Sequence, residues 1–149
     1  MTPDVNVLVA ASRSDHPHYR AARGWLESAA VQAATIAPLT VQPMVSASFL
    51  RLVTHPKIFG HPTPVAEAVQ FVDALLSMPG VGVPALGGEW PAFRQLCVDK
   101  KLAANDLPDA WLAAAVTHQG EHLVTFDRDF KRLLQRRQFT LLEGWGYPT

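Results

Sequence analysis

Apolar positions along this chain follow two kinds of pattern. Where they recur every three or four residues the sequence predicts helices, and where they form short valine-rich runs bounded by glycine or proline it predicts strands. The predicted helices cover residues 16–30, 41–54, 64–78, 87–101, 106–120 and 127–137. The predicted strands cover residues 3–10, 31–39, 79–86, 122–126 and 139–143.

Strands that alternate with helices in this way indicate a parallel sheet covered on both faces. Residues 3–10 show little polar–apolar alternation and are rich in valine, which favours an interior strand of such a sheet. A chain of 149 residues with no internal repeat or long linker is expected to form one domain, residues 1–149. The predicted fold class is therefore α/β, with three α/β/α layers around a central parallel sheet.

Composition narrows the range of functions. Hydrophobic residues make up 48% of the chain and charged residues 17%, and the formal net charge is zero. This balance is typical of a globular protein and argues against broad, non-specific nucleic-acid binding, although a local basic patch is compatible with it. Cys97 is the only cysteine, which fits a reducing compartment. With no secretory leader and no apolar run near the ~20 residues of a membrane span, we expect a cytoplasmic location without membrane contact.

Aspartates gather around the predicted carboxyl ends of strands. Asp4 lies in the first predicted strand, Asp127 directly follows the strand at 122–126, and Asp109 lies on the first turn of the helix at 106–120. Ligands of such folds bind at this edge of the sheet, so we expect these carboxylates to converge there. Grouped carboxylates repel one another unless a cation neutralises them, and Mg2+ or Mn2+ is the natural partner. The pattern predicts a metal-dependent site that cuts phosphodiester bonds.

Some of these acids also have a purely structural interpretation. Asp106 stands at a helix start and is expected to be an N-cap, and Asp129 is open to the same explanation. Asp4 is harder to explain in this way, because a lone carboxylate in a valine-rich strand is costly to bury. Asn6, two residues further on the same side of that strand, is placed to orient it.

Four segments in order along the chain carry a resemblance to a known family. They are Asp4-Val5-Asn6, FLRLVTHP at 49–56, PDAWLAAAVTHQG at 108–120 and TFDRDF at 125–130. Together they resemble PIN-domain ribonucleases, in particular the VapC-type toxins of bacterial toxin–antitoxin pairs. The resemblance implies a compact α/β/α domain, RNA cleavage that depends on Mg2+ or Mn2+, frequent homodimerisation and inhibition by a cognate antitoxin protein.

The resemblance also assigns roles to individual residues. It implies that Asp4 on the first strand, Asp109 on the helix and Asp127 after the later strand are metal ligands. It also implies that Asp129 is a nearby accessory acid and that Thr125 and Asn6 are polar supports.

The chain departs from the family at one position. The family usually carries a glutamate on the second helix, where this sequence has Ser46, or Ser48 if the register shifts. No acidic residue occurs between Glu27 and Glu67, and Asp106 is a candidate for a substitute charge. The alternative to an active ribonuclease is therefore a catalytically weakened PIN-like module that binds RNA or protein.

Basic and aromatic side chains have two interpretations each. Arg51 and the basic cluster after Asp127 either contact RNA phosphates or are ordinary exposed cations. Tryptophans either stack on bases or serve in packing. The basic cluster comprises Arg128, Lys131, Arg132, Arg136 and Arg137, and the tryptophans are Trp25, Trp90, Trp111 and Trp145.

Overall fold

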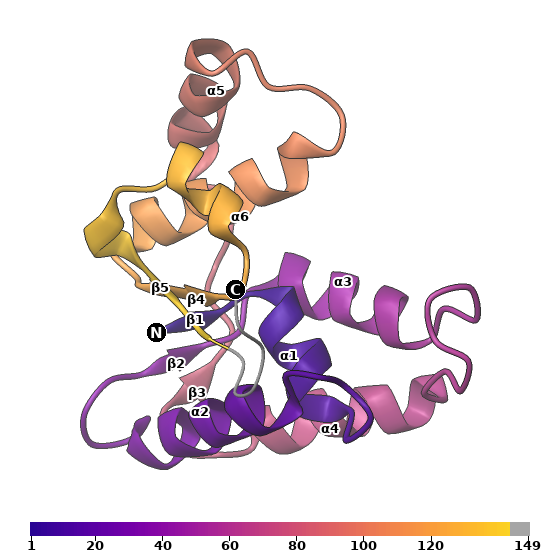
Figure 1. Ribbon diagram of the computed structural model, residues 1–149. Coiled ribbons are helices and arrows are strands. Elements are labelled where there is room, and N and C mark those ends of the chain that lie inside the picture. Colours follow the sequence, from indigo (N-terminus) through magenta and orange to yellow (C-terminus); the bar gives the residue numbers. More distant parts are fainter. Residues whose placement is uncertain (144–149) are drawn as a thin grey trace.

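The computed structural model describes residues 1–143 and shows helices on both sides of a small sheet (Figure 1). Helices α1 to α4 lie on one side of the strands, and α5 and α6 lie on the other. The helices are α1 (Val5–Ser12), α2 (Tyr19–Gln32), α3 (Pro43–Val53), α4 (Val65–Leu76), α5 (Trp90–Asp99), α6 (Asp106–Gln119) and the 3-10 turns η1 (Arg128–Arg132) and η2 (Arg136–Gln138).

The strands are short and pair in parallel. They are β1 (Thr2–Pro3), β2 (Leu39–Thr40), β3 (Val81–Gly82), β4 (Leu123–Thr125) and β5 (Phe139–Leu141). One sheet has the order β1-β4-β5, and β2 pairs with β3. The N–H of Thr40 donates to the carbonyl of Met1 at 2.8 Å, which places β2 beside β1. The predicted α/β/α fold with a central parallel sheet is confirmed.

The prediction of a strand over residues 3–10 is wrong. The strand ends at Pro3, and Val5–Ser12 form α1. Five consecutive residues of α1, 7–11, are buried, so this helix shows no polar face from which a helical period could be recognised. The predicted strand at 31–39 is also mostly wrong, because α2 continues to Gln32 and β2 begins only at Leu39.

Other elements differ from the predictions in length or in the kind of helix. The strand expected over 79–86 is reduced to Val81–Gly82. The helix expected over 127–137 becomes two 3-10 turns, η1 and η2. Helix α6 ends where the sequence predicts, because Gly120 adopts a left-handed conformation with φ 66°.

Helices α1 and α6 form much of the interior. Leu8 and Ala10 of α1 are completely buried, and α1 packs against both α2 and α3. On α6 the run Ala113 to Ala115 is completely buried, and these small side chains let the helix approach its neighbours closely.

Among the helices of residues 1–143, none has the length and apolar character that crossing a bilayer requires.

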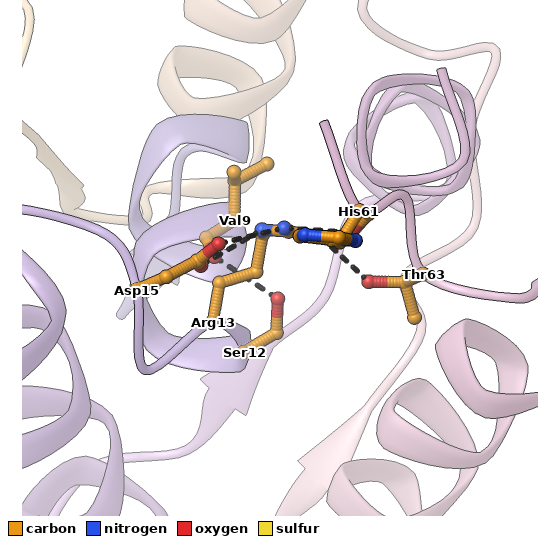
Figure 2. A network of polar contacts seen from close by, with 6 residues as sticks. All are labelled: Val9, Ser12, Arg13, Asp15, His61 and Thr63. Atoms are coloured by element: carbon orange, nitrogen blue, oxygen red, sulfur yellow. Dashed lines mark hydrogen bonds and ion pairs between the residues drawn. The ribbon is translucent and has the colours of Figure 1, made fainter. Parts of the chain in front are cut away.

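Arg13 anchors the long loop between α3 and α4 to the end of α1 (Figure 2). Its side chain is only 7% exposed and donates to Thr63 Oγ1 (3.0 Å) and to the carbonyl of His61 (2.9 Å). The same guanidinium pairs with Asp15 at 2.9 Å and lies 3.8 Å from the centre of the Phe59 ring. One buried cation therefore fixes the position of residues 59–63.

We expect Arg13→Met to lower the free energy of unfolding by about 1–3 kcal/mol, because the carbonyl of His61 and the Thr63 hydroxyl lose their donor. Urea denaturation measures this change. The matched control is Arg23→Met, whose exposed ion pair with Glu27 is expected to contribute only about 0.5 kcal/mol. Equal losses in the two variants would contradict the anchoring role of Arg13.

Candidate active site

Asp4 sits at the junction of β1 and α1 and is 3% exposed. Its Oδ1 accepts from the backbone N–H of Val5 at 2.7 Å, so the side chain caps the start of α1. Its Oδ2 accepts from the hydroxyl of Thr125 at 2.7 Å. The expected carboxylate is thus present at the edge of the sheet, on a helix cap rather than within a strand.

Thr125, the last residue of β4, connects the parts of the site. While its hydroxyl donates to Asp4, its Oγ1 accepts from Asn6 Nδ2 (3.2 Å) and from the backbone N–H of Asp127 (2.9 Å). Asn6 Oδ1 in turn accepts from the N–H of Phe126 at 3.2 Å. Asn6 and Thr125 therefore lie between Asp4 and Asp127 and tie the start of α1 to the end of β4.

Asp127 and Asp129 occupy the turn that follows β4. Asp127 is half-buried, and its Oδ1 accepts from the N–H of Asp129 at 2.8 Å, which caps η1. The cap expected at Asp129 is therefore supplied by Asp127. The Asp129 side chain is exposed in the first turn of η1.

Asp109, on the first turn of α6, completes the group. Burial raises its pKa, and the negative charges of nearby aspartates, Asp127 first, raise it further, against the lowering effect of Arg132. Burial likewise raises the pKa of Asp4 from 3.8 to about 6, although its hydrogen bonds from Thr125 and Val5 oppose the shift. The charges of Asp109 and Asp127 add to that increase. The three carboxylates are thus close enough to influence one another.

A groove of about 880 Å3 runs beside these carboxylates, between α3 and the α5–α6 pair. Asp4 and Asp109 are part of its wall, whereas Asp127 and Asp129 are not among its lining residues. Most of the wall is apolar. The apolar lining residues are Val5, Pro43, Met44, Val45, Ala47, Trp90, Phe93, Leu107, Pro108, Trp111 and Leu112.

The groove also distinguishes the two serines of α3. Ser48 lines it, and Ser46 is not among the lining residues. A third acidic side chain of this groove, Glu89, is 4% exposed and was not among the candidates that the sequence suggests. Glu89 is far from the aspartates in the sequence and precedes a helix, so only the pair of glycines before it distinguishes it from an ordinary surface acid.

The remaining candidates lie around this centre. The expectation that Asp106 is an N-cap is wrong, because Asn105 holds that position; Asp106 accepts from Arg132 Nη2 at 3.2 Å instead. Arg51 is exposed on the last turn of α3 and is not among the groove residues. All five side chains of the basic cluster are exposed on η1 and η2 or at their ends. Trp145 lies outside the described residues.

The donor set suits a hard divalent cation. Carboxylate oxygens are the ligands that Mg2+ and Mn2+ prefer, and the mutual repulsion of Asp4, Asp109 and Asp127 is what a cation would relieve. Within residues 1–143, however, no three His, Cys, Asp or Glu side chains are already close enough to hold an ion. The chemistry of these residues fits a metal, and binding requires side-chain movements that bring their oxygens together.

Sequence similarity to known proteins identifies the family of this chain. The PIN domain family matches residues 1–134 of the chain. Ribonuclease VapC31 of Mycobacterium tuberculosis is 40% identical over 136 residues, which cover 90% of this chain and 93% of the relative. The VapC ribonuclease Mb2897 of Mycobacterium bovis is 39% identical over 143 residues, which cover 95% of both chains. The chain belongs to the PIN-domain family, and within it to the VapC-type proteins.

A solved structure supports the fold independently. It is described as VapBC2 from Rickettsia felis bound to a DNA fragment from their promoter. A chain of that structure matches with a TM-score of 0.66, covering 95% of this chain and 98% of its own length. The sequence identity is only 16%, so this likeness concerns the fold alone.

The raised pKa of Asp4 predicts how stability depends on pH. The folded protein holds this proton more tightly than the unfolded chain, so the free energy of unfolding falls as pH rises from 3.8 to about 6. At about 1.4 kcal/mol per pKa unit, the loss from Asp4 is about 2–3 kcal/mol. We expect Asp4→Asn, which keeps the acceptor for Val5 but loses the one for Thr125, to gain stability relative to the wild type as pH rises in EDTA.

Urea denaturation of both proteins between pH 4 and pH 8 measures this effect. The stability of Asp4→Asn minus that of the wild type should increase with pH and level off above pH 6. An Asp73→Asn control, at an exposed position on α4, should show no such trend. A stability difference between the two proteins that does not change between pH 4 and pH 8 would contradict the raised pKa of Asp4.

Proposed function

We propose that this protein is a Mg2+- or Mn2+-dependent endoribonuclease toxin of a type II toxin–antitoxin system, with Asp4, Asp109, Asp127 and Asp129 as its acidic site. The observation that carries the proposal is the convergence of three carboxylates from separate elements beside a groove, where the charges of Asp109 and Asp127 raise the pKa of Asp4 and the charge of Asp127 raises the pKa of Asp109. The relatives named as VapC ribonucleases support the same activity.

Asp4, Asp109 and Asp127 would hold the metal. A bound divalent ion supplies positive charge that activates a water and neutralises the charge developing on the phosphate. Thr125 and Asn6 fix the orientation of Asp4 relative to the turn that carries Asp127. Asp129 is proposed as an accessory acid next to this group.

The proposed partners are an RNA substrate and a separate antitoxin chain. The names of the relatives support the first, and the description of the Rickettsia felis structure as a VapBC protein supports the second. We propose that Arg51 and the basic cluster on η1 and η2 contact RNA phosphates, and their exposure supports this. We further propose that residues 1–149 act as one domain and that two copies form a homodimer, as VapC-type proteins frequently do.

Purified protein is expected to make discrete cuts in total cellular RNA when Mg2+ or Mn2+ is present, and none in EDTA. Asp4→Asn and Asp109→Asn should each reduce the rate at least about 100-fold, because each removes one negative charge from the proposed metal site. Asp73→Asn, a matched change at an exposed position, should cleave like the wild type. Cleavage that persists in EDTA, or in both site variants, would reject the proposal.

The second candidate function is a weakened PIN-like module that binds RNA or protein without cutting. The observation that favours it is the lack of a carboxylate on α3, whose groove-lining hydroxyl is Ser48. If the missing acid limits metal binding, a glutamate in place of Ser48 should restore metal binding. Rapid cleavage by the wild type would exclude this candidate.

Ser48→Glu is therefore expected to increase both cleavage and the rise in melting temperature caused by millimolar Mg2+, because ligand binding stabilises the folded state. Differential scanning fluorimetry measures the second effect without relying on activity. Ser46→Glu is the matched control, since Ser46 lies on the same helix but is not among the groove residues. Equal responses of the two variants would contradict this placement.

A further inference from the structure

The segment before α5 lies against α6 and closes one side of the groove. Glu89 is buried in this segment, and its Oε1 accepts from the indole Nε1–H of Trp111 at 2.8 Å. Its Oε2 accepts from the backbone N–H of Gly87 at 2.7 Å. Gly87, Glu89 and Trp111 all line the groove that contains Asp4 and Asp109. The carboxylate therefore links the segment and the helix that together form this wall.

The two glycines before Glu89 make this contact possible. A Cβ atom on Gly88 would lie 2.5 Å from Nε2 of the exposed His118 side chain, so a larger residue at this position would displace the His118 ring. Gly87 has φ +121°, a conformation that L side chains rarely adopt. Trp111 and His118 are seven residues apart, or two turns of α6, and so lie on the same face of the helix. The segment thus follows that face at two points of contact.

The charge of Glu89 is preserved despite its burial. Burial raises the pKa of this carboxyl, but the hydrogen bonds from Trp111, from its own backbone and from Gly87, together with His118, bring the pKa below its usual value. The carboxylate is therefore ionised at neutral pH, and its hydrogen bond to the indole is charge-assisted and stronger than a neutral one. Two donors, the indole of Trp111 and the N–H of Gly87, orient this carboxylate, and the carboxylate in turn holds the indole.

Because Trp111 lies in the groove wall, its contact with Glu89 bears on how the proposed RNA substrate binds. Trp111 lies two residues after Asp109 on α6, and Trp90 and Phe93 extend the aromatic wall. Because Asp4 and Asp109 line this groove, RNA that approaches them along it contacts the aromatic wall. Its apolar lining suits a base or ribose rather than a phosphate, and an aromatic ring that stacks on a base contributes about 1–3 kcal/mol.

We infer that Glu89 is a positioning residue for the RNA substrate: it holds the indole of Trp111 in the groove wall, and Trp111 packs against a nucleotide beside the bond that is cut. This inference rests on the proposed function, because it assumes that RNA occupies the groove. It predicts that the Glu89–Trp111 contact affects RNA binding and leaves the chemical step unchanged.

The test compares Trp111→Phe, Glu89→Leu, Glu89→Gln and the double variant Trp111→Phe/Glu89→Leu. We expect Trp111→Phe and Glu89→Leu each to raise KM for RNA about tenfold, which is the size of one lost base contact. In both variants kcat should stay within about twofold of the wild-type value. Glu89→Gln keeps one acceptor for the indole and should lie between them and the wild type. The double variant should resemble the single ones, because both changes remove the same contact.

A binding measurement makes the result independent of cleavage. The dissociation constant of a fluorescently labelled single-stranded RNA, measured by anisotropy in an Asp4→Asn background, should also rise about tenfold in Trp111→Phe. Trp25→Phe, a matched change on α2 away from the groove, should alter neither KM nor the dissociation constant. Thermal melting of each variant checks that it is folded.

The outcomes separate the two proposals. A wild type that binds RNA but does not cut it rejects the ribonuclease function, while the dissociation constants still decide the role of Glu89. The inference about Glu89 is overturned by unchanged RNA affinity in Trp111→Phe, by an equal loss in Trp25→Phe, or by a fall in kcat alone. It is also overturned if the wild type binds no RNA.

Discussion

The burial of the Asp4 carboxylate is the constraint on which the rest of the structure depends. A carboxylate that is 3% exposed requires hydrogen-bond donors, and here they come from Val5 at the start of α1 and from Thr125 at the end of β4. The backbone N–H of Asp4 also donates to the carbonyl of Val124 at 2.9 Å. The same few atoms therefore start α1, hold β1 beside β4 and present an acid at the edge of the sheet, so fold and site cannot be altered separately at this point.

Two different surfaces meet at that edge. On one side, Asp109 and Asp127 add negative charge to that of Asp4, which suits a cation and disfavours an RNA phosphate until the charge is neutralised. On the other side, the groove between α3 and the α5–α6 pair is mostly apolar, which suits the bases and riboses. A zero net charge with an exposed basic cluster on η1 and η2 fits this division, since attraction for phosphate is local rather than spread over the molecule.

The sequence predicts some elements and site residues of this arrangement and does not predict others. Helices α3, α4 and α6 and strand β4 were predictable because their apolar spacing and bounding glycines and prolines are clear, and the convergence of Asp4, Asp109 and Asp127 follows from the parallel topology. Helix α1 was not predictable, because burial on nearly every side removes the helical period. Glu89 was not predictable either, because its role depends on the packing of a glycine-containing segment against α6 rather than on any local pattern.

Asp4 both stabilises the start of α1 and is a proposed metal ligand, so its hydrogen bonds affect how the proposed enzyme would bind its cation. Each oxygen of Asp4 accepts one hydrogen bond within the protein, and a carboxylate oxygen has a second acceptor position, so an ion can bind without breaking the cap or the contact with Thr125. With its pKa raised to about 6, the carboxyl binds a proton under mildly acidic conditions. Proton and cation then compete for the same charge. Burial is the main cause of the raised pKa, and the negative charges of Asp109 and Asp127 add to it. A bound divalent ion would relieve that repulsion, so the acids that destabilise the metal-free fold at neutral pH are those that would favour a cation.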